Sequence, residues 1–174
     1  MRKIEVKSYD EHWIWLFENE AEKLHRIFGP EIIKIHHIGS TSVNGLKAKP
    51  IIDMMPIVKE INRIDQYNPA MIGLGYEPKG ENGICGRRYF KKGGDNRTHH
   101  VHIYEVGNPE IDRHLAFRDY LRANPDVSKA YGDLKKELSQ RFPYDVASYI
   151  KGKEQLALEI ERNAVAWYRH EERN

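Results

Sequence analysis

A single charge in an apolar segment is the feature that most constrains this chain. The run Ile51-Ile52-Asp53-Met54-Met55 lies within residues 50–58, whose composition predicts a largely buried strand. A carboxylate in such surroundings costs several kcal/mol unless it is paired, protonated or bound to a cation. Asp53 therefore indicates a functional site or a structural ion pair, for which the candidate partners are Lys49, Arg87 and Arg88.

The segments before and after that strand alternate between helical and extended patterns. Apolar residues recur at helical spacing from Trp13 to Phe28, and Asp10 is placed to cap this helix. Residues 32–38 predict a strand that ends in a small-residue turn. Residues 60–74 predict a helix broken at Asn68-Pro69, followed by a short extended piece at 76–78. Residues 87–92 and 98–106 predict a hairpin around a glycine-rich turn.

The last third of the chain is helical in pattern. Asn108-Pro109-Glu110 and Asn124-Pro125-Asp126 each combine a capping side chain, a proline and an acid, and a third long helix is predicted to begin near Asp145. We therefore expect an α/β (α+β) fold with a mixed β-sheet flanked by helices. We predict one domain over residues 1–174, with the sheet core at about 30–106 and a C-terminal helical subregion at about 109–170.

Composition narrows the class of protein. The formal net charge is only +2, which is too weak a field to argue for nucleic-acid binding by electrostatics alone. No segment approaches the roughly 20 apolar residues of a membrane span, and the single cysteine, Cys85, excludes an internal disulfide. We expect a cytoplasmic protein.

The turn Gly39-Ser40-Thr41-Ser42 is a candidate phosphate site. A glycine lets the main chain approach a ligand, and hydroxyl and N–H groups suit phosphate oxygens. A short helix beginning near Ser42 would add its N-terminal dipole. The alternative is an ordinary capped turn without a ligand.

The segment Thr98-His99-His100-Val101-His102 is a candidate metal or acid–base site. Strand alternation places His100, His102 and Tyr104 on one face and His99, Val101 and Ile103 on the other. Two imidazoles on one face suit a single metal ion, or a metal ligand and a general base. The alternative is that they are surface residues of a half-exposed hairpin. His36-His37, before the glycine-serine turn, adds a third candidate imidazole.

Several basic residues could neutralise a bound phosphate. Most lysines on hairpins are simply solvated, so we select Lys49, for its place beside the Asp53 strand, and Arg88. The full set from which they are taken is Lys47, Lys49, Arg87, Arg88, Lys91, Lys92 and Arg97.

The order of several motifs closely resembles the GrpB family. The resemblance rests on residues 37–46 (HIGSTSVNGL), 48–53 (AKPIID), 73–76 (GLGY), 97–102 (RTHHVH), 114–121 (HLAFRDYL) and 131–135 (YGDLK). It covers nearly the whole chain, from about Tyr9 to the final helix.

This resemblance implies a nucleotidyltransferase-like fold. In that superfamily a Gly-Ser loop holds nucleotide phosphates, and paired acids bind divalent metal; Gly39 and Ser40 match the loop and Asp53 the first acid. Met55 stands where the second acid is expected, and a thioether cannot replace a carboxylate on Mg²⁺. His102 stands in the place of the third acid, which would favour Mn²⁺ or Zn²⁺.

The leading functional prediction is a metal-dependent nucleotidyltransferase that binds a nucleotide or other phosphorylated small molecule. Gly39, Ser40 and Thr41 would bind phosphate, Lys49 and Arg88 would balance its charge, and Asp53, His100 and His102 would hold a divalent Mn, Mg or Zn ion. The alternatives are a catalytically degenerate nucleotide- or cofactor-binding module and a single-metal phosphoester hydrolase. All three require the turn, Asp53 and the histidine pair to share one cleft.

Overall fold

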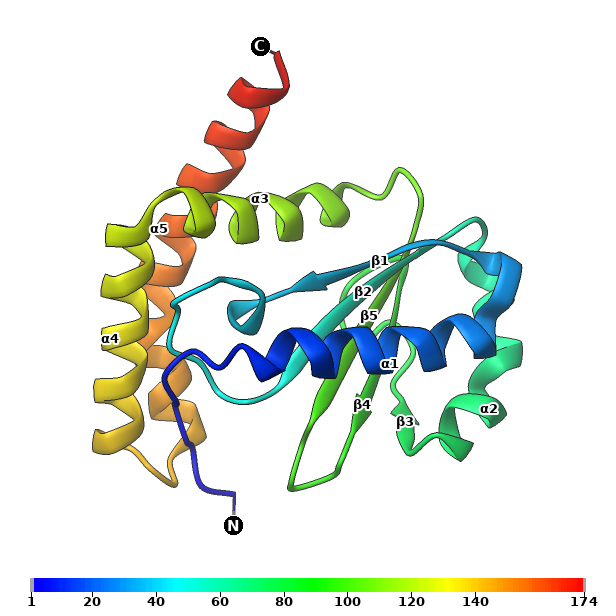
Figure 1. Cartoon of the computed structure of the whole chain (residues 1–174), viewed down its shortest axis with the longest axis horizontal. Helices are drawn as coiled ribbons and strands as arrows, with labels where there is room; N and C mark the ends of the chain where they lie inside the picture. The colour runs from blue at the N-terminus through cyan, green and yellow to red at the C-terminus, as the bar shows by residue number, and fades with distance from the viewer. Residues whose placement is uncertain (1, 174) are drawn as a thin grey trace. The chain divides into compact units, whose positions relative to one another are not determined.

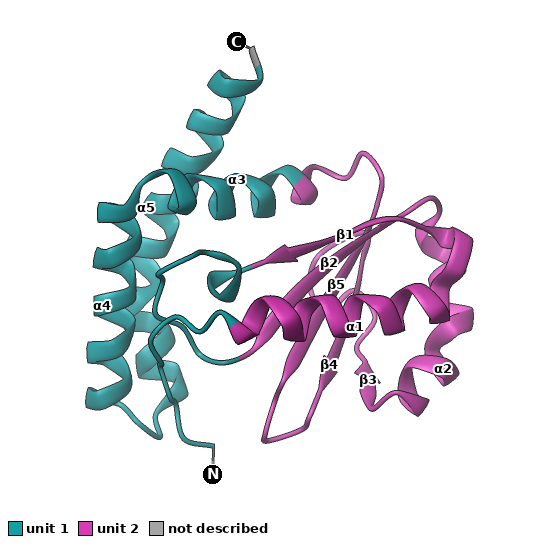
Figure 2. Ribbon diagram, viewed as in Figure 1, with its two compact units in different colours: residues 1–11, 39–50, 112–174 teal, residues 12–38, 51–111 magenta. Residues whose placement is uncertain are grey.

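The structure, a computed structural model, describes residues 2–173. The chain divides into two compact units (Figure 2): unit 1 comprises residues 1–11, 39–50 and 112–174, and unit 2 comprises residues 12–38 and 51–111. No helix within the described range has the length and apolar character needed to cross a bilayer.

Unit 2 is built on a mixed five-stranded sheet. Its strands are β1 (Ile32–Ile38), β2 (Ile52–Val58), β3 (Tyr76–Pro78), β4 (Arg87–Lys92) and β5 (His99–Glu105), in the spatial order β1-β2-β5-β4-β3 (Figure 1). The β2–β5 pair is parallel and the other pairs are antiparallel. The mixed sheet and all five extended segments predicted from the sequence are confirmed.

The turn between β4 and β5 fixes the alignment of these strands. Gly93 has φ 103°, a left-handed conformation that favours glycine, and a Cβ built there would lie 2.3 Å from the carbonyl oxygen of Asn96. With this turn, Lys92 pairs with His99 and Tyr89 pairs with His102. The glycine-rich turn thus decides which side chains meet across the hairpin.

The helix α1 (His12–Phe28) runs across one face of the sheet (Figure 1). Trp13, Leu24 and Phe28 are buried, as the helical spacing predicted. Glu20 is also buried, with 2% of its surface exposed, although the apolar pattern gave no sign of it. A buried acid on a helix needs polar partners, and Lys92 of β4 and His99 of β5 supply them.

The helix predicted over residues 60–74 is broken where the proline indicated. A 3-10 helix, η3 (Ile61–Tyr67), precedes α2 (Asn68–Gly73), and Pro69 lies in the first turn of α2. Proline lacks an N–H and fits the start of a helix better than its interior.

Unit 1 is mainly helical. Its helices are α3 (Pro109–Ala123), whose first turn belongs to unit 2, α4 (Pro125–Arg141) and α5 (Val146–Arg173). Asn108 Oδ1 accepts from the Glu110 N–H at 2.9 Å, as a helix cap does. The cap predicted at Asn124 is wrong, because its side-chain amide donates to the Tyr120 carbonyl at 2.8 Å instead.

Residues 39–50 pack within unit 1. A Cβ added at Gly132 of α4 would lie 3.2 Å from the main-chain nitrogen of Lys47, so a glycine allows this close approach. The segment also contributes two side chains to a buried cluster, whose members are Val43, Leu46, Leu121, Tyr131 and Ile160. The glycine-serine turn is therefore anchored by α3, α4 and α5.

Candidate functional site

Asp53 and the histidine pair lie together on one face of the sheet in unit 2. Asp53 pairs with His100 across the parallel β2 and β5 strands, and His102 follows two residues later on the same face. Asp53 Oδ1 is 3.3 Å from His100 Nδ1 and 3.2 Å from His102 Nε2. One carboxylate oxygen therefore faces both imidazoles.

The surroundings of Asp53 keep it ionised. Burial alone would raise the pKa of Asp53, but the hydrogen bonds from His100 and His102 outweigh burial and hold its pKa well below the usual range. The side chain remains 26% exposed. Asp53 is thus an anion that solvent, or a ligand, can still reach.

Arg87 lies on the same face and completes this group. Its Nη1 is 3.4 Å from His102 Nδ1. Its Nε donates to the Glu81 carbonyl at 3.1 Å and its Nη2 to the Asn82 carbonyl at 2.8 Å, and the guanidinium lies 4.9 Å from the centre of the Tyr89 ring. Only 7% of Arg87 is exposed, so the guanidinium is a fixed donor directed at His102.

Arg88, which the sequence selected, lies on the opposite face of the sheet. It pairs with Ile103 across β4 and β5. Its Nε and Nη2 donate to the two carboxylate oxygens of Asp65 at 2.8 and 3.3 Å. The structure therefore does not bring Arg88 to Asp53, so Arg88 is not the ion-pair partner among the three candidates Lys49, Arg87 and Arg88. Strand alternation separates the two arginines, but only the hairpin alignment decides which of them shares the face of Asp53.

The donor set does not suit a metal ion bound by Asp53, His100 and His102 together. Residues 2–173 contain no group of three or more His, Cys, Asp or Glu side chains arranged to hold a metal. A metal-bound imidazole usually gives its second N–H to an acceptor. The second nitrogen of His102 instead faces Arg87, which can only donate.

The histidines before the turn face opposite ways. His37 stacks on Phe17 of α1, with ring centres 4.7 Å apart. His36 pairs with Met55 in the sheet, which places it on the face of Asp53. Met55 is completely buried, so the position of the expected second acid belongs to the core.

The glycine-serine turn has the conformation that glycine favours. Gly39 has φ 72° and ψ −173°, and Ser40–Ser42 form a single 3-10 turn in which the Ser42 N–H donates to the Gly39 carbonyl at 3.1 Å. Val43 is already extended. The short helix considered near Ser42 is not formed, so no helix dipole contributes here.

Two cations from distant helices hold this turn within unit 1. Lys135 Nζ donates to Ser40 Oγ at 2.8 Å, and Lys135 is only 3% exposed. Arg122 Nε and Nη2 donate to the Ser42 carbonyl at 3.0 and 2.7 Å. The sequence-predicted Lys49 also belongs to unit 1, and its Nζ lies 4.9 Å from the centre of the Tyr149 ring.

Sequence reasoning missed Lys135, although its position carried a signal. The buried residues of α4 recur at helical spacing and are Ser128, Tyr131, Gly132, Lys135, Leu138 and Ser139. A lysine within such a stripe must find a polar partner, because burying an unpaired ammonium is costly. The pattern alone could not identify Ser40 as that partner.

The turn belongs to unit 1 and the Asp53 group to unit 2. Each half of the predicted site is internally organised, with its own cations and hydrogen bonds. The single cleft that the sequence predicts for both halves stays a prediction.

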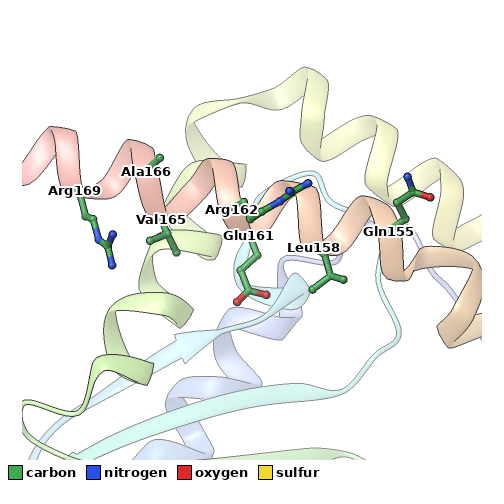
Figure 3. A pocket seen from close by; sticks show the side chains of 7 residues that line it. All are labelled: Gln155, Leu158, Glu161, Arg162, Val165, Ala166 and Arg169. Atoms are coloured by element: carbon green, nitrogen blue, oxygen red, sulfur yellow. The ribbon is translucent and has the colours of Figure 1, made fainter.

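The helix α5 carries a surface hollow of a different character (Figure 3). Leu158, Val165 and Ala166 provide its apolar lining, beside Glu161 and Arg162. Its lining comes from one helix and includes none of the residues predicted for the site. The hollow is therefore separate from the residues that the sequence predicts for phosphate binding.

Comparison with known proteins identifies relatives of this chain. The family model described as GrpB protein matches residues 3–163. The UPF0157 protein YqkA of Bacillus subtilis is 54% identical over 95% of this chain, which spans 48% of that relative. A dephospho-CoA kinase of Mycobacterium leprae is 25% identical to this chain, and the match covers 91% of this chain and 45% of the kinase.

Solved structures place the fold. The chain matches the conserved protein GrpB from Enterococcus faecalis with a TM-score of 0.91 and 47% identity, over 94% of this chain and 99% of that one. It matches the Cid1 poly(U) polymerase, solved with MgGTP bound, with a TM-score of 0.54 and 17% identity over 78% of this chain and 45% of that one. The second match shows a nucleotidyltransferase-like fold alone. With a family model covering nearly its full length, this chain belongs to the GrpB family.

Proposed function

We propose that this chain binds a nucleotide or another phosphorylated small molecule, with a phosphate group at Gly39, Ser40 and Thr41. The observation that carries the proposal is the 2.8 Å contact from Lys135 Nζ to Ser40 Oγ, made by a lysine that is 3% exposed. A buried ammonium beside a hydroxyl supplies charge and donors to phosphate oxygens, and its burial strengthens both.

Asp53 is the second residue in the proposal. Its ionised side chain is 26% exposed and lies beside His100 and His102 within unit 2. We assign phosphate binding to the turn of unit 1, and we propose Asp53 as the residue on which nucleotidyl transfer, as opposed to binding, depends.

The nature of the relatives supports a nucleotide or cofactor as the ligand. Cid1 shares the fold and is a polymerase solved with a nucleotide, and the mycobacterial relative is named for a kinase of a coenzyme precursor. Nucleotidyl transfer is the finer form of the proposal. A binding module without turnover is the second candidate, favoured by Met55, which is completely buried where a second metal-binding acid is expected.

Titration calorimetry tests ligand binding. ATP, GTP, CTP, UTP and dephospho-coenzyme A are titrated separately, with and without Mn²⁺. We expect saturable binding of at least one of them, weakened at least about tenfold by Lys135→Met, since a charged hydrogen bond contributes about 1.5–3 kcal/mol. Lys129→Met is the matched control, because Lys129 is on the same helix but its side chain is 78% exposed and paired with Asp133.

Two results would count against this proposal. One is the absence of heat with every compound under both conditions. The other is an equal loss of affinity in the Lys135 and Lys129 variants, which would remove the turn from the binding site.

A pyrophosphate-release assay separates transfer from binding alone. Transfer from a nucleoside triphosphate would release pyrophosphate, and Asp53→Asn would abolish the release. A binding module would retain affinity in both the native chain and Asp53→Asn, with no pyrophosphate from either.

A further inference from the structure

The hydrogen-bonding role of Arg87 determines where His102 carries its proton. A guanidinium has only donors and keeps its charge at every pH relevant to proteins. Arg87 Nη1 faces His102 Nδ1 at 3.4 Å, so this nitrogen must present its lone pair. The remaining nitrogen of a neutral imidazole then bears the hydrogen, which gives His102 an Nε2–H group.

That Nε2–H group is directed at Asp53. The distance from His102 Nε2 to Asp53 Oδ1 is 3.2 Å, which allows a hydrogen bond to the carboxylate. A divalent ion bound at His102 Nε2 would have to displace this hydrogen while Arg87 still occupied the other nitrogen. Loss of both hydrogens from one imidazole is far less favourable than ligation by an ordinary neutral histidine, whose second N–H meets an acceptor.

Arg87 itself is held too firmly to move aside easily. Main-chain carbonyls of Glu81 and Asn82 accept from two other nitrogens of its guanidinium. The side chain is buried and lies over the Tyr89 ring. Rotation away from His102 would break these contacts together.

We propose that Arg87 is a positioning residue that keeps His102 in the neutral Nε2–H form, so that His102 donates to Asp53 and is withheld from divalent metal ions. The group then offers an acceptor, Asp53 Oδ2, and beside it lies His100 Nε2, a buried nitrogen for which residues 2–173 supply no hydrogen-bond partner. A ligand meeting Asp53 brings O–H or N–H groups. The proposal concerns unit 2 alone and does not depend on phosphate binding at the turn.

Long-range ¹H–¹⁵N spectra of the uniformly ¹⁵N-labelled chain test the tautomer directly. The imidazole of His102, assigned by its disappearance in His102→Gln, is expected to show a protonated Nε2 and an unprotonated Nδ1 at neutral pH. Arg87→Met is expected to introduce the Nδ1–H tautomer. Arg88→Met, on the opposite face, is the matched control and should leave the His102 signals unchanged. A native His102 with a protonated Nδ1 would overturn the proposal.

Titration with Zn²⁺ provides a second readout that needs no activity. In the native chain the His102 Nε2–H signal is expected to persist when Zn²⁺ is added in stoichiometric amount. Removing Arg87 should increase Zn²⁺ affinity at His102 about tenfold, the usual scale of effects from groups next to metal ligands. Stoichiometric loss of the His102 Nε2–H signal in the native chain would overturn the proposal. If Arg87→Met does not fold, the tautomer and titration of the native chain decide it.

Discussion

The two faces of β5 place the same kind of side chain in different settings. On the face covered by α1, His99 Nε2 lies 3.2 Å from Glu20 Oε2. On the other face, His100 and His102 meet Asp53 at similar distances. The Glu20 side chain is 3% exposed, whereas that of Asp53 is 26% exposed.

The two acids differ in the charge of their partners, and this difference distinguishes the structural group at Glu20 from the candidate site at Asp53. Lys92 Nζ lies 3.2 Å from Glu20 Oε2, so a full cation compensates the buried acid. Asp53 is met by imidazoles instead, and Arg87 contacts one of these. An acid neutralised by a lysine has little left to offer a ligand, whereas an ionised acid among imidazoles retains its charge for one.

The largest expected effect is on the covered face. Glu20→Ala should lower the free energy of unfolding by about 3 kcal/mol, because it leaves Lys92 without its partner in a largely buried position. Urea denaturation at pH 7 measures the change. Glu22→Ala, on the same helix with a side chain 64% exposed, is the control and should cost less than about 0.5 kcal/mol. Equal losses in the two variants would remove the distinction between them.

A smaller loss is expected on the open face. Asp53→Asn should lower the free energy of unfolding by about 1 kcal/mol, since the amide oxygen still accepts a hydrogen bond and water screens the lost charge. The same urea experiment applies. A loss as large as that for Glu20→Ala would mean that Asp53 is chiefly structural.

The two faces should differ in the pH range over which the stability of the fold changes. Burial is the main reason that the pKa of His99 is lowered, with Lys92 nearby adding to the effect. A histidine with a depressed folded pKa binds its proton more readily when unfolded, so stability falls as pH drops below 6.5, the ordinary value. His99→Gln should flatten the stability curve just below that pH, by at most about 1.4 kcal/mol per pH unit for one proton.

Asp53 acts in a different range. Its lowered pKa contributes stability above the ordinary value of 3.8, and this is lost as pH falls further toward the folded pKa. Asp53→Asn should therefore change the curve only below about pH 4. Thermal denaturation from pH 8 to 3 follows both windows, and a change near pH 6 in Asp53→Asn would contradict the assignment.

The smallest effect is expected from the arginine on the covered face. Arg88→Met breaks a pair whose acid, Asp65, has a side chain 56% exposed, so the loss should be about 0.5 kcal/mol. Urea denaturation is again the measurement. A loss above about 2 kcal/mol would show that this pair resembles a buried ion pair rather than a surface one.

Local patterns predicted most of the fold. Asn-Pro dipeptides marked the starts of α3 and α4, and the proline in residues 60–74 marked the break between η3 and α2. Alternation along β5 correctly assigned His99 to one face and His100 to the other. These features depend on neighbouring residues, so one sequence contains enough information for them.

The contacts that organise the candidate site are not local. Lys135 is 95 residues from Ser40, and Arg122 is 80 residues from Ser42. The choice of Arg87 over Arg88 depends on the alignment of a hairpin, which alternation leaves open. Glu20 could not be distinguished from a solvated helix residue until β4 and β5 were placed beside it.

Two identical residues in succession make β5 unusual in how it would tolerate misalignment. If the strand slid by one residue against β2 so that His99 came opposite Asp53, His100 would move to the face of Glu20, and each carboxylate would still have an imidazole on its face. Hydrogen bonding near the acids would oppose that misalignment only in part, because Asp53 would keep one imidazole and lose His102. The misalignment is opposed by the turn at Gly93, where a Cβ does not fit, and by Val101 and Ile103, which would leave the core. An insertion or deletion of one residue at the tip of the β4–β5 hairpin could thus exchange the partners of His99 and His100 without changing either residue.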